Sequence, residues 1–468
     1  MTRAWPVVLL ALLPLLLPAC SRFAAPPAPG TCSGGPTPAP STQQPSPSAG
    51  NWPAYQGGGA QAGVLSGPAF QRAGKAWETA RLDGPVFAAP IVAGGVAIVA
   101  TECNSVYGFD ASNGRPLWTK RLADPMAASS LTCAGNIQPT SGITSTPVAD
   151  PGSNQLYVVA FQQPGQHVLH ALDLRSGRES WHQTVDPPGE NVKSEQQRGA
   201  LQLAGGSVYV PYGGLFGDCG RYHGWVVGVR TATHQQTGFE PPGCPNMCAI
   251  WAPGGPTVGP DGDLWVATGN SDGSVGSFDG GNAVYRLTPG LQARDWFAPS
   301  NWRSLSSEDG DLGSIAPVLL PGGLAWISGK DGTGYLLRQD HLGNVGGAAA
   351  TGPACASYGA GVATGASVLL PCWGDQPGVL QVRVDSSTPA FTRGWRSSLE
   401  MPGGLIEAFG AVWVIGTDSG TLYALDPQTG GVRFRLSGGP AEHFATPAAA
   451  GGKVYAALDR RLVAVDVR

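Results

Sequence analysis

The sequence predicts an all-β protein, an eight-bladed β-propeller that is closed by pairing of its N- and C-terminal strands. Three observations predict it: a recurring strand–turn–strand pattern, a composition rich in turn residues, and an incomplete last repeat with a matching lone strand near the start. Of 468 residues, 70 are Gly, 42 are Pro and 42% are hydrophobic. Gly and Pro interrupt helices and favour turns, while this hydrophobic content suffices for a core.

Residues 1–20 have the form of a lipoprotein signal peptide. Arg3 precedes an apolar run from Val7 to Leu17, which is too short to span a bilayer comfortably. The run ends in Leu-Pro-Ala-Cys, which resembles the bacterial lipobox, so we expect Cys20 to carry the lipid. An ordinary signal peptide with a chance Cys is the alternative.

Residues 21–50 are predicted to form a flexible tether rich in Pro, Gly and Ser. The segment has a single charged residue, Arg22, and little apolar surface to bury, so an extended chain is favoured. We therefore expect an exported protein that a lipid holds on a membrane, at the cell surface or in the periplasm.

The folded body, residues 51–468, repeats one pattern. The clearest copies begin at Val106 (VYGFDASNGRPLW), Leu169 (LHALDLRSGRESW) and Leu422 (LYALDPQTGGVRF). In each copy an apolar strand leads to a turn, where Asp caps backbone N–H groups and Gly supplies a positive φ. The next strand reaches an aromatic residue, which we expect to fill the space between neighbouring sheets.

Eight copies of this pattern imply eight blades. The copies begin at positions 106, 169, 226, 284, 334, 380, 422 and 462, so successive starts lie 40 to 63 residues apart, which suits four-stranded blades. The last copy lacks its turn and outer strand. The segment Lys75–Leu82 (KAWETARL) offers the missing strand, and this pairing would leave no exposed edge. Two stacked β domains are the alternative architecture.

Nine Cys residues in an exported chain predict disulfides. Cys355 and Cys372 flank one strand–turn unit and form the best candidate pair. Weaker candidates are Cys103 with Cys133 and Cys219 with Cys244 or Cys248, which leaves Cys32 unpaired. The Cys244–Cys248 spacing lacks a second ligand pair, so a zinc site is not expected there.

The distribution of charge disfavours a nucleic-acid partner. The net charge is −4, and the 28 Lys and Arg residues are scattered rather than gathered into a phosphate-binding stripe. We expect a monomer. His167 and His170 lie three residues apart on one predicted strand and therefore point to opposite faces, which makes them poor metal co-ligands.

The Ala-x-Asp-x-x-x-Gly-x-x-x-Trp repeat resembles that of the quinoprotein propellers, and the resemblance covers nearly all of residues 51–468. It implies the quinoprotein type of eight-bladed propeller. The superfamily includes alcohol dehydrogenases that depend on pyrroloquinoline quinone (PQQ). It also includes propellers without cofactor, such as the lipoprotein subunit of the outer-membrane β-barrel assembly machine.

In those enzymes a Trp stacks under the quinone, a Glu and an Asn bind Ca²⁺, an Asp acts as base, and a Lys or Arg contacts the quinone oxygen. The same order appears here as Trp251, Asn270, Asp311 and Lys330. The resemblance therefore implies a cofactor site with Trp251 and Lys330, a calcium ligand at Asn270 and a catalytic base at Asp311. These residue types suit a flat cofactor, a hard cation and proton transfer.

The chain also departs from the enzymes. The slot of the calcium-binding Glu holds Gly217–Arg221, where Asp218 is a shifted substitute, and no adjacent Cys pair or C-x-x-C-H haem motif occurs. These departures favour a cofactor-free binding or scaffold module that holds an envelope protein or small ligand on one propeller face. The alternative is a PQQ- and Ca²⁺-dependent dehydrogenase of alcohols or aldose sugars. A third reading, a sugar- or polymer-binding propeller, rests on an aromatic cluster at Tyr212, Tyr222, His223 and Trp225.

Overall fold

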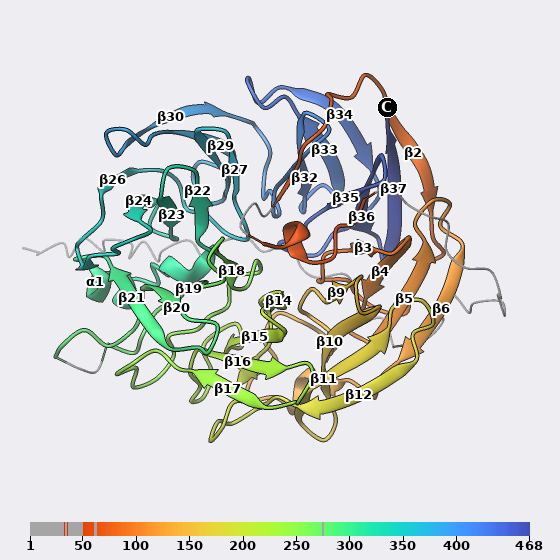
Figure 1. The fold of residues 1–468 in the computed structure, drawn as a ribbon, viewed down its shortest axis with the longest axis horizontal. Helices are drawn as coiled ribbons and strands as arrows, with labels where there is room; N and C mark the ends of the chain where they lie inside the picture. Colours follow the sequence, from red (N-terminus) through yellow and green to blue (C-terminus); the bar gives the residue numbers. More distant parts are fainter. Residues whose placement is uncertain (1–31, 33–34, 36–49, 60–62, 274–275) are drawn as a thin grey trace, which may run out of the picture.

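The computed structural model describes Cys32, Gly35 and residues 50–59, 63–273 and 276–468. Eight antiparallel sheets stand around one axis as the blades of a β-propeller, which confirms the predicted fold class (Figure 1). Cys20, the expected signal peptide and most of the expected tether lie outside the described residues. No helix of the described part has the length and hydrophobicity needed to cross a bilayer.

Blades 1 to 4 each run from an inner strand beside the axis to an outer strand. Blade 1 comprises β3 (Ile91–Ala93), β4 (Val96–Ala100), β5 (Ser105–Asp110) and β6 (Pro116–Arg121). Blade 2 comprises β9 (Val148–Asp150), β10 (Gln155–Gln162), β11 (Gln166–Asp173) and β12 (Glu179–Thr184). Blade 3 comprises β14 (Gln202–Ala204), β15 (Ser207–Gly214), β16 (Trp225–Arg230) and β17 (Gln236–Phe239), with β13 (Glu195–Gln196) beside β15. Blade 4 comprises β18 (Thr257–Val258), β19 (Leu264–Ala267), β20 (Val284–Leu287) and β21 (Ala293–Ala298), with β25 (Asn344–Val345) added outside.

Blades 5 to 8 continue the circle. Blade 5 comprises β22 (Val318–Leu320), β23 (Leu324–Ser328), β24 (Thr333–Arg338) and β26 (Ala350–Pro353), and blade 6 comprises β27 (Val362–Thr364), β28 (Ser367–Cys372), β29 (Gly378–Asp385) and β30 (Ala390–Arg396). Blade 7 comprises β31 (Ile406–Ala408), β32 (Ala411–Gly416), β33 (Thr421–Leu425) and β34 (Val432–Ser437), with β1 (Val64–Leu65) on its inner edge. Blade 8 comprises β35 (Ala448–Ala450), β36 (Lys453–Leu458), β37 (Arg461–Val467) and β2 (Ala73–Glu78). Outside the blades lie the pair β7 (Met126–Ala127) and β8 (Thr140–Ser141), helix α1 (Trp302–Ser307) and the 3₁₀ turns η1 (Tyr55–Gly57), η2 (Ala128–Ser130) and η3 (Leu312–Ser314).

Blade 8 closes the ring in the way the sequence predicts. Its outer strand β2 comes from the start of the body and pairs antiparallel with β37 at the end of the chain. The two strands run side by side in Figure 1. Trp77 of β2 packs near Tyr455 of β36, with ring centroids 5.8 Å apart. Closure thus covers the outer edge of β37, which would otherwise be unpaired.

The repeat couples each blade to the next. Trp118 of β6 donates from Nε1 to the Leu174 carbonyl of blade 2 at 3.1 Å. A Cβ at Gly177, in the turn of blade 2, would lie 2.5 Å from the Trp118 ring, and Gly177 has φ +67°. The turn therefore needs Gly both for its backbone conformation and for room beneath the aromatic ring of the preceding blade.

Four disulfides are present, and one of them is the expected Cys355–Cys372 bond. The other expected pairings are wrong: the bonds join Cys32 to Cys103, Cys133 to Cys219, and Cys244 to Cys248. Segments distant along the chain meet in the first two of these bonds, so spacing did not reveal them, whereas Cys244 and Cys248 pair within one loop. Cys32 is not unpaired, and its bond fixes one point of the expected tether to blade 1. Four disulfides are typical of an exported protein.

Small residues surround the axis where each blade begins. Tyr55, from the segment ahead of blade 1, lies among them and contacts Ala89, Ala200 and Ala360. Its hydroxyl lies 2.8 Å from the Thr446 Oγ1. Tyr55 is 3% exposed, so its ring fills the axis and separates the two ends of the propeller.

Candidate functional site

The propeller has two chemically different ends. The loops between second and third strands and the loops that join successive blades gather at one end, which we call the loop face. The turns between first and second strands gather at the other end, the turn face. This division follows from the antiparallel order of the strands in every blade. Each end holds a candidate site.

Four of the residues singled out in the sequence come together on the loop face. Lys330 Nζ lies 2.6 Å from Asp311 Oδ2 and 2.7 Å from Asp309 Oδ1. The Asn270 backbone N–H donates to Asp311 Oδ1 at 2.6 Å. Lys330 Nζ also lies 5.7 Å from the centroid of the Trp251 ring. Loops of blades 3, 4 and 5 thus place Trp251, Asn270, Asp311 and Lys330 in one cluster.

Two carboxylates hold the Lys330 amine in its charged form. Burial disfavours the ammonium, but Asp311 and Asp309 more than offset this effect and raise the pKa of Lys330. The side chain of Lys330 is 18% exposed and that of Asp311 is 11% exposed. The ion pair is therefore strong because little water reaches it.

The side chain of Asn270 is occupied by neighbouring protein groups. Its Nδ2 donates to Asp309 Oδ1 at 3.0 Å, and its Oδ1 accepts from Asn282 Nδ2 at 3.1 Å. Asn282 also accepts from the Leu312 N–H at 2.8 Å. This chain of bonds secures the loop that carries Asp311.

Asp218 lies near this cluster, and its surroundings disfavour its charged form. Burial raises the pKa of its carboxyl group, Tyr222 opposes the rise by donating a hydrogen bond, and the Asp311 charge adds to the rise. Tyr222 is 1% exposed, Tyr212 is 0% exposed and His223 is 4% exposed. These buried rings do not form an open aromatic surface, which contradicts the expectation for a sugar-binding loop.

Residues that the sequence did not suggest cover the axis on this face. Phe444 lies 6.2 Å from Trp251, 5.1 Å from Trp373 and 6.3 Å from Tyr358 between ring centroids. The Arg198 guanidinium lies 5.2 Å from the Phe444 ring centroid and donates to the His443 carbonyl at 3.2 Å. These residues come from different blade-connecting loops, and no shared motif marked them.

Buried charges accompany this aromatic cluster. Glu102 is fully buried, and burial raises the pKa of its carboxyl group to about 7, although hydrogen bonds and the Arg198 charge oppose this. Burial and the Arg198 charge lower the pKa of His443 to about 3. The His443 ring is therefore neutral, and Arg198 provides the positive charge beneath the loop face.

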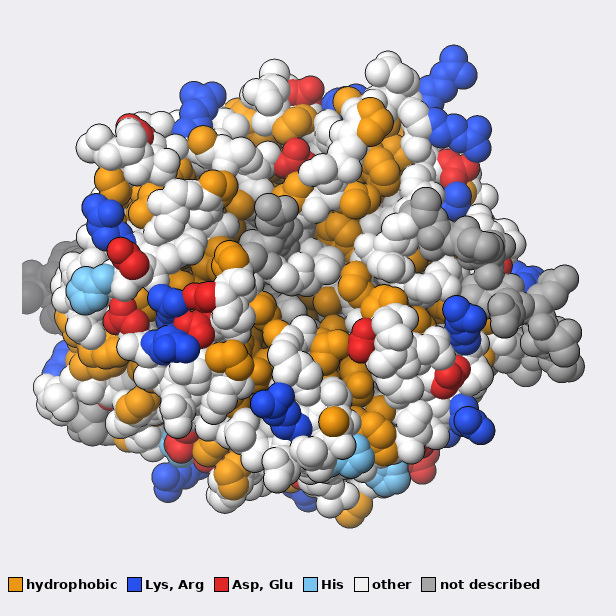
Figure 2. All heavy atoms as spheres, in the orientation of Figure 1, with side chains coloured by type: hydrophobic (Ala, Val, Ile, Leu, Met, Phe, Trp, Pro, Cys, Tyr) orange, Lys and Arg blue, Asp and Glu red, His pale blue; other side chains and the backbone are white. Residues whose placement is uncertain are grey.

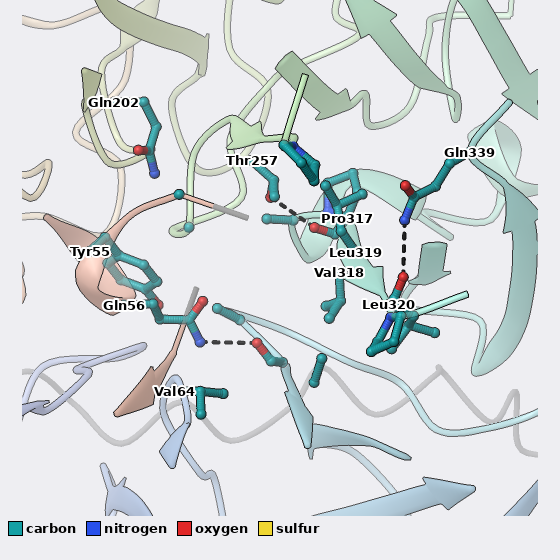
Figure 3. Close-up of a pocket in the computed structure, with 18 of the residues that line it drawn as sticks. Tyr55, Gln56, Val64, Gln202, Thr257, Pro317, Val318, Leu319, Leu320 and Gln339 are labelled. Carbon is teal, nitrogen blue, oxygen red and sulfur yellow. Dashed lines mark hydrogen bonds between the residues drawn. The ribbon is translucent and has the colours of Figure 1, made fainter. Parts of the chain in front are cut away.

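The turn face holds a cavity of about 660 Å³. Its walls are formed by residues ahead of blade 1 and by the inner parts of blades 3 to 6, with Val318, Leu319 and Leu320 of β22 on one side (Figure 3). The residues ahead of blade 1 are Tyr55, Gln56, Gly59 and Val64. None of its described lining residues is charged. Hydrophobic side chains gather around the centre of this view of the molecule (Figure 2).

Three carboxamides supply the polarity of the cavity. Gln56 Nε2 donates to the Gly361 and Leu405 carbonyls at 3.0 and 2.6 Å, and Gln339 Nε2 donates to the Leu324 carbonyl at 2.6 Å. Gln202 is 5% exposed, and its side chain also ends in an amide. Figure 3 shows this amide directed toward the cavity.

Comparisons with known proteins agree with this architecture. Residues 71–213 and 387–468 match the family described as outer membrane protein assembly factor BamB. The matched parts contain blades 1 and 2, most of β15 and the last two blades. No curated protein matches the sequence.

Solved structures give the same fold. The quinohemoprotein alcohol dehydrogenase ADHIIG from Pseudomonas putida HK5 is 13% identical with a TM-score of 0.67, covering 89% of this chain and 80% of its own. The quinohemoprotein alcohol dehydrogenase from Comamonas testosteroni is 16% identical with a TM-score of 0.63, covering 89% and 80%. BamB from Moraxella catarrhalis is 13% identical with a TM-score of 0.54, covering 84% and 98%.

The chain is a PQQ-like β-propeller protein. For this PQQ-like propeller the question is whether the loop-face residues fit the quinone and its calcium ion. Asn270 Oδ1 already accepts a hydrogen bond, Lys330 is paired with two carboxylates, and Phe444 packs near the Trp251 ring. In this arrangement the residues fit PQQ and Ca²⁺ poorly. The side chains that would contact the quinone or the calcium ion already bind to other side chains of the protein.

Proposed function

We propose that this protein is a binding module of the cell envelope, which takes an extended, uncharged and mainly apolar segment of a partner protein into the turn-face cavity. The observation that supports this proposal is the cavity itself. Inner strands of several blades line it, and none of its described lining residues is charged. A site of this kind favours a neutral apolar ligand, because a charge would lose its hydration without gaining an ion pair.

The inner strands supply a second reason to expect an extended segment. The chain already covers two inner edges with its own residues: β1 pairs parallel with β31, and Trp52 forms an antiparallel bridge with Val92 of β3. The inner strands β18, β22 and β27 are edge strands whose other side is free for such pairing. A partner segment that adds to β22 would gain main-chain hydrogen bonds, while its side chains enter the cavity.

Site-specific photo-crosslinking tests this proposal. A benzoylphenylalanine at Val318 should form a crosslink to one envelope protein, and the same probe at Asp309 on the loop face should not. The crosslinked segment, made as a peptide, should bind the wild-type protein and the Asp309→Arg variant but not Leu319→Arg. Equal binding to the two variants would refute the assignment to the turn face.

We further propose that the exported chain is anchored through lipid on Cys20. The supporting observations are the Leu-Pro-Ala-Cys sequence and four disulfides, which form in oxidising compartments. Cys20→Ser should move the protein from the membrane fraction to the soluble fraction. Unchanged membrane association of this variant would contradict the lipid anchor.

A PQQ- and Ca²⁺-dependent dehydrogenase is the second candidate, because Trp251, Asp311 and Lys330 lie together on the loop face. Reconstitution with PQQ and Ca²⁺ distinguishes it from the first. The enzyme predicts quenched Trp fluorescence and dye reduction with alcohols or aldose sugars, and Trp251→Ala and Asp311→Ala should abolish both. A lack of PQQ binding at micromolar concentration would reject this candidate without affecting the binding module.

A further inference from the structure

Blade 2 carries three metal-ligating side chains at one point of its outer hairpin. His170 lies on β11 and His182 on β12, and the two residues are directly opposite in the strand register. His170 Nδ1 lies 3.1 Å from Glu179 Oε1, and His182 Nδ1 lies 2.7 Å from the same oxygen. One nitrogen from each ring and one carboxylate oxygen therefore converge.

A β-bulge brings Glu179 to this side of the hairpin. Glu179 and His182 are three residues apart, so in a regular strand their side chains would point to opposite faces. The register shifts beside Ala171 and Leu172, and Ser180 is left without a partner. Such a bulge redirects the side chains that follow it. As a result Glu179, His170 and His182 share one face.

The other blades show that the bulge belongs to the repeat and the ligands belong to blade 2. The same register shift occurs between β5 and β6 and between β33 and β34. At the equivalent positions, blade 1 has Tyr107, Pro116 and Thr119, and blade 7 has Tyr423, Val432 and Arg435. Neither set can bind a metal ion. Blade 2 thus uses a common backbone feature to present a distinct set of side chains.

We propose that His170, Glu179 and His182 form a binding site for a borderline divalent metal ion such as Zn²⁺. With metal–ligand distances near 2.0–2.2 Å, ligand atoms of a tetrahedral site lie about 3.3 Å apart. The two separations from Glu179 Oε1 need to widen by only a few tenths of an ångström, and all three ligand atoms already lie within 4.8 Å of one another. Two imidazole nitrogens and one carboxylate oxygen suit Zn²⁺ and disfavour Ca²⁺, which prefers six or more oxygens. The fourth position faces solvent, since the His182 side chain is 64% exposed.

One neighbouring cation limits the affinity of this site. Lys120, from the outer strand of blade 1, has its Nζ 3.7 Å from Glu179 Oε2. Its charge repels a bound metal ion and competes for the carboxylate. Lys120 also links the site to the contact between blades 1 and 2, so metal binding draws Glu179 away from that contact.

Metal titration of the untagged protein tests the site. Zn²⁺ should bind by calorimetry, and Co²⁺ should give the intense visible absorption of a tetrahedral complex with nitrogen ligands. His182→Ala should weaken binding by about 100-fold, since loss of a ligand costs at least as much as loss of its supporting contacts. Lys120→Gln should strengthen binding about threefold, as expected for removal of a partly exposed charge.

Two control variants make the assignment specific. His341→Ala removes an exposed His that has one acidic neighbour, Asp295, and should leave binding unchanged. His223→Ala removes the centre of another cluster, with Glu190 and Glu240, and should also leave the Co²⁺ spectrum unchanged. Failure of Zn²⁺ to bind below about 100 µM, or a spectrum lost with His223→Ala but kept with His182→Ala, would overturn the proposal.

Discussion

The loop face and the turn face are built from the same eight-fold repeat, yet they treat polar groups in opposite ways. On the loop face, charged side chains are bonded to one another, as where Lys330 lies between the buried Asp311 and the exposed Asp309. On the turn face, the cavity has no charged lining residue among those described, and the Gln202 amide is directed into it (Figure 3). The comparison teaches that the charged residues gathered around Lys330 on the loop face are occupied by one another, whereas the turn face offers an uncharged cavity with room for a ligand.

The largest expected effect concerns the buried acid of the loop face. Burial raises the pKa of Glu102 from 4.5 to about 7, so the folded protein holds this proton more tightly than the unfolded chain. The contribution of Glu102 to the unfolding free energy is therefore complete below pH 4.5 and is lost as the pH rises to about 7, by on the order of 3 kcal/mol. Glu102→Gln should remove this fall between pH 4.5 and 7 in urea unfolding curves. Glu400→Gln, at an exposed site, should leave it, and an equal pH dependence of both variants would contradict the burial argument.

The next effect tests whether the loop-face cluster is held by its ion pair. Asp311→Asn should lower the unfolding free energy by about 2 kcal/mol, because Lys330 loses its buried partner and keeps only the exposed Asp309. Chemical denaturation at pH 7 measures the loss. The matched control is Asp375→Asn, at an exposed position of the same face, with an expected change near zero. Similar values for the two variants would show that the cluster adds no stability.

A smaller effect is expected at the point that separates the two ends. Tyr55→Phe keeps the ring in the axis and removes the hydroxyl that lies 2.8 Å from Thr446 Oγ1. The unfolding free energy should fall by about 1 kcal/mol, the usual value of one buried hydrogen bond. Tyr423→Phe, on β33 of blade 7, provides a same-chemistry control, because the Tyr423 hydroxyl makes no hydrogen bond with the described residues. A loss in the control as large as in Tyr55→Phe would contradict a specific role for the axial hydroxyl.

The smallest effect on stability is expected in the cavity. Gln202→Ala removes an amide that is directed into the cavity, so the unfolding free energy should change by less than about 0.5 kcal/mol. The same variant should weaken binding of the crosslinked partner peptide. A large loss of stability with unchanged peptide binding would mean that Gln202 supports the fold rather than the ligand.

The sequence determined the fold because its repeat contains the contacts that build it. The Asp and Gly of the turn, and the aromatic residue that packs over the next turn, are local signals that recur in the clearest copies of the repeat, and the lone strand around Trp77 completed the count. Order along the chain also placed Trp251, Asn270, Asp311 and Lys330 near one another, since equivalent loops of successive blades meet at one end. Their chemical roles stay predictions.

Tertiary structure decided what depends on neighbours distant in sequence. Cys103 pairs with Cys32 and Cys133 with Cys219 because loops of different blades meet, and spacing along the chain carries no record of that. Glu179 joins His170 and His182 because a β-bulge turns its side chain to their face of the hairpin. No residue motif in the sequence announced this grouping. The cavity arises because Tyr55 and β1 fill one part of the axial mouth and leave the edges of blades 4 to 6 uncovered. Each of these depends on how surfaces pack in three dimensions, which a pattern of residue types along one chain does not specify.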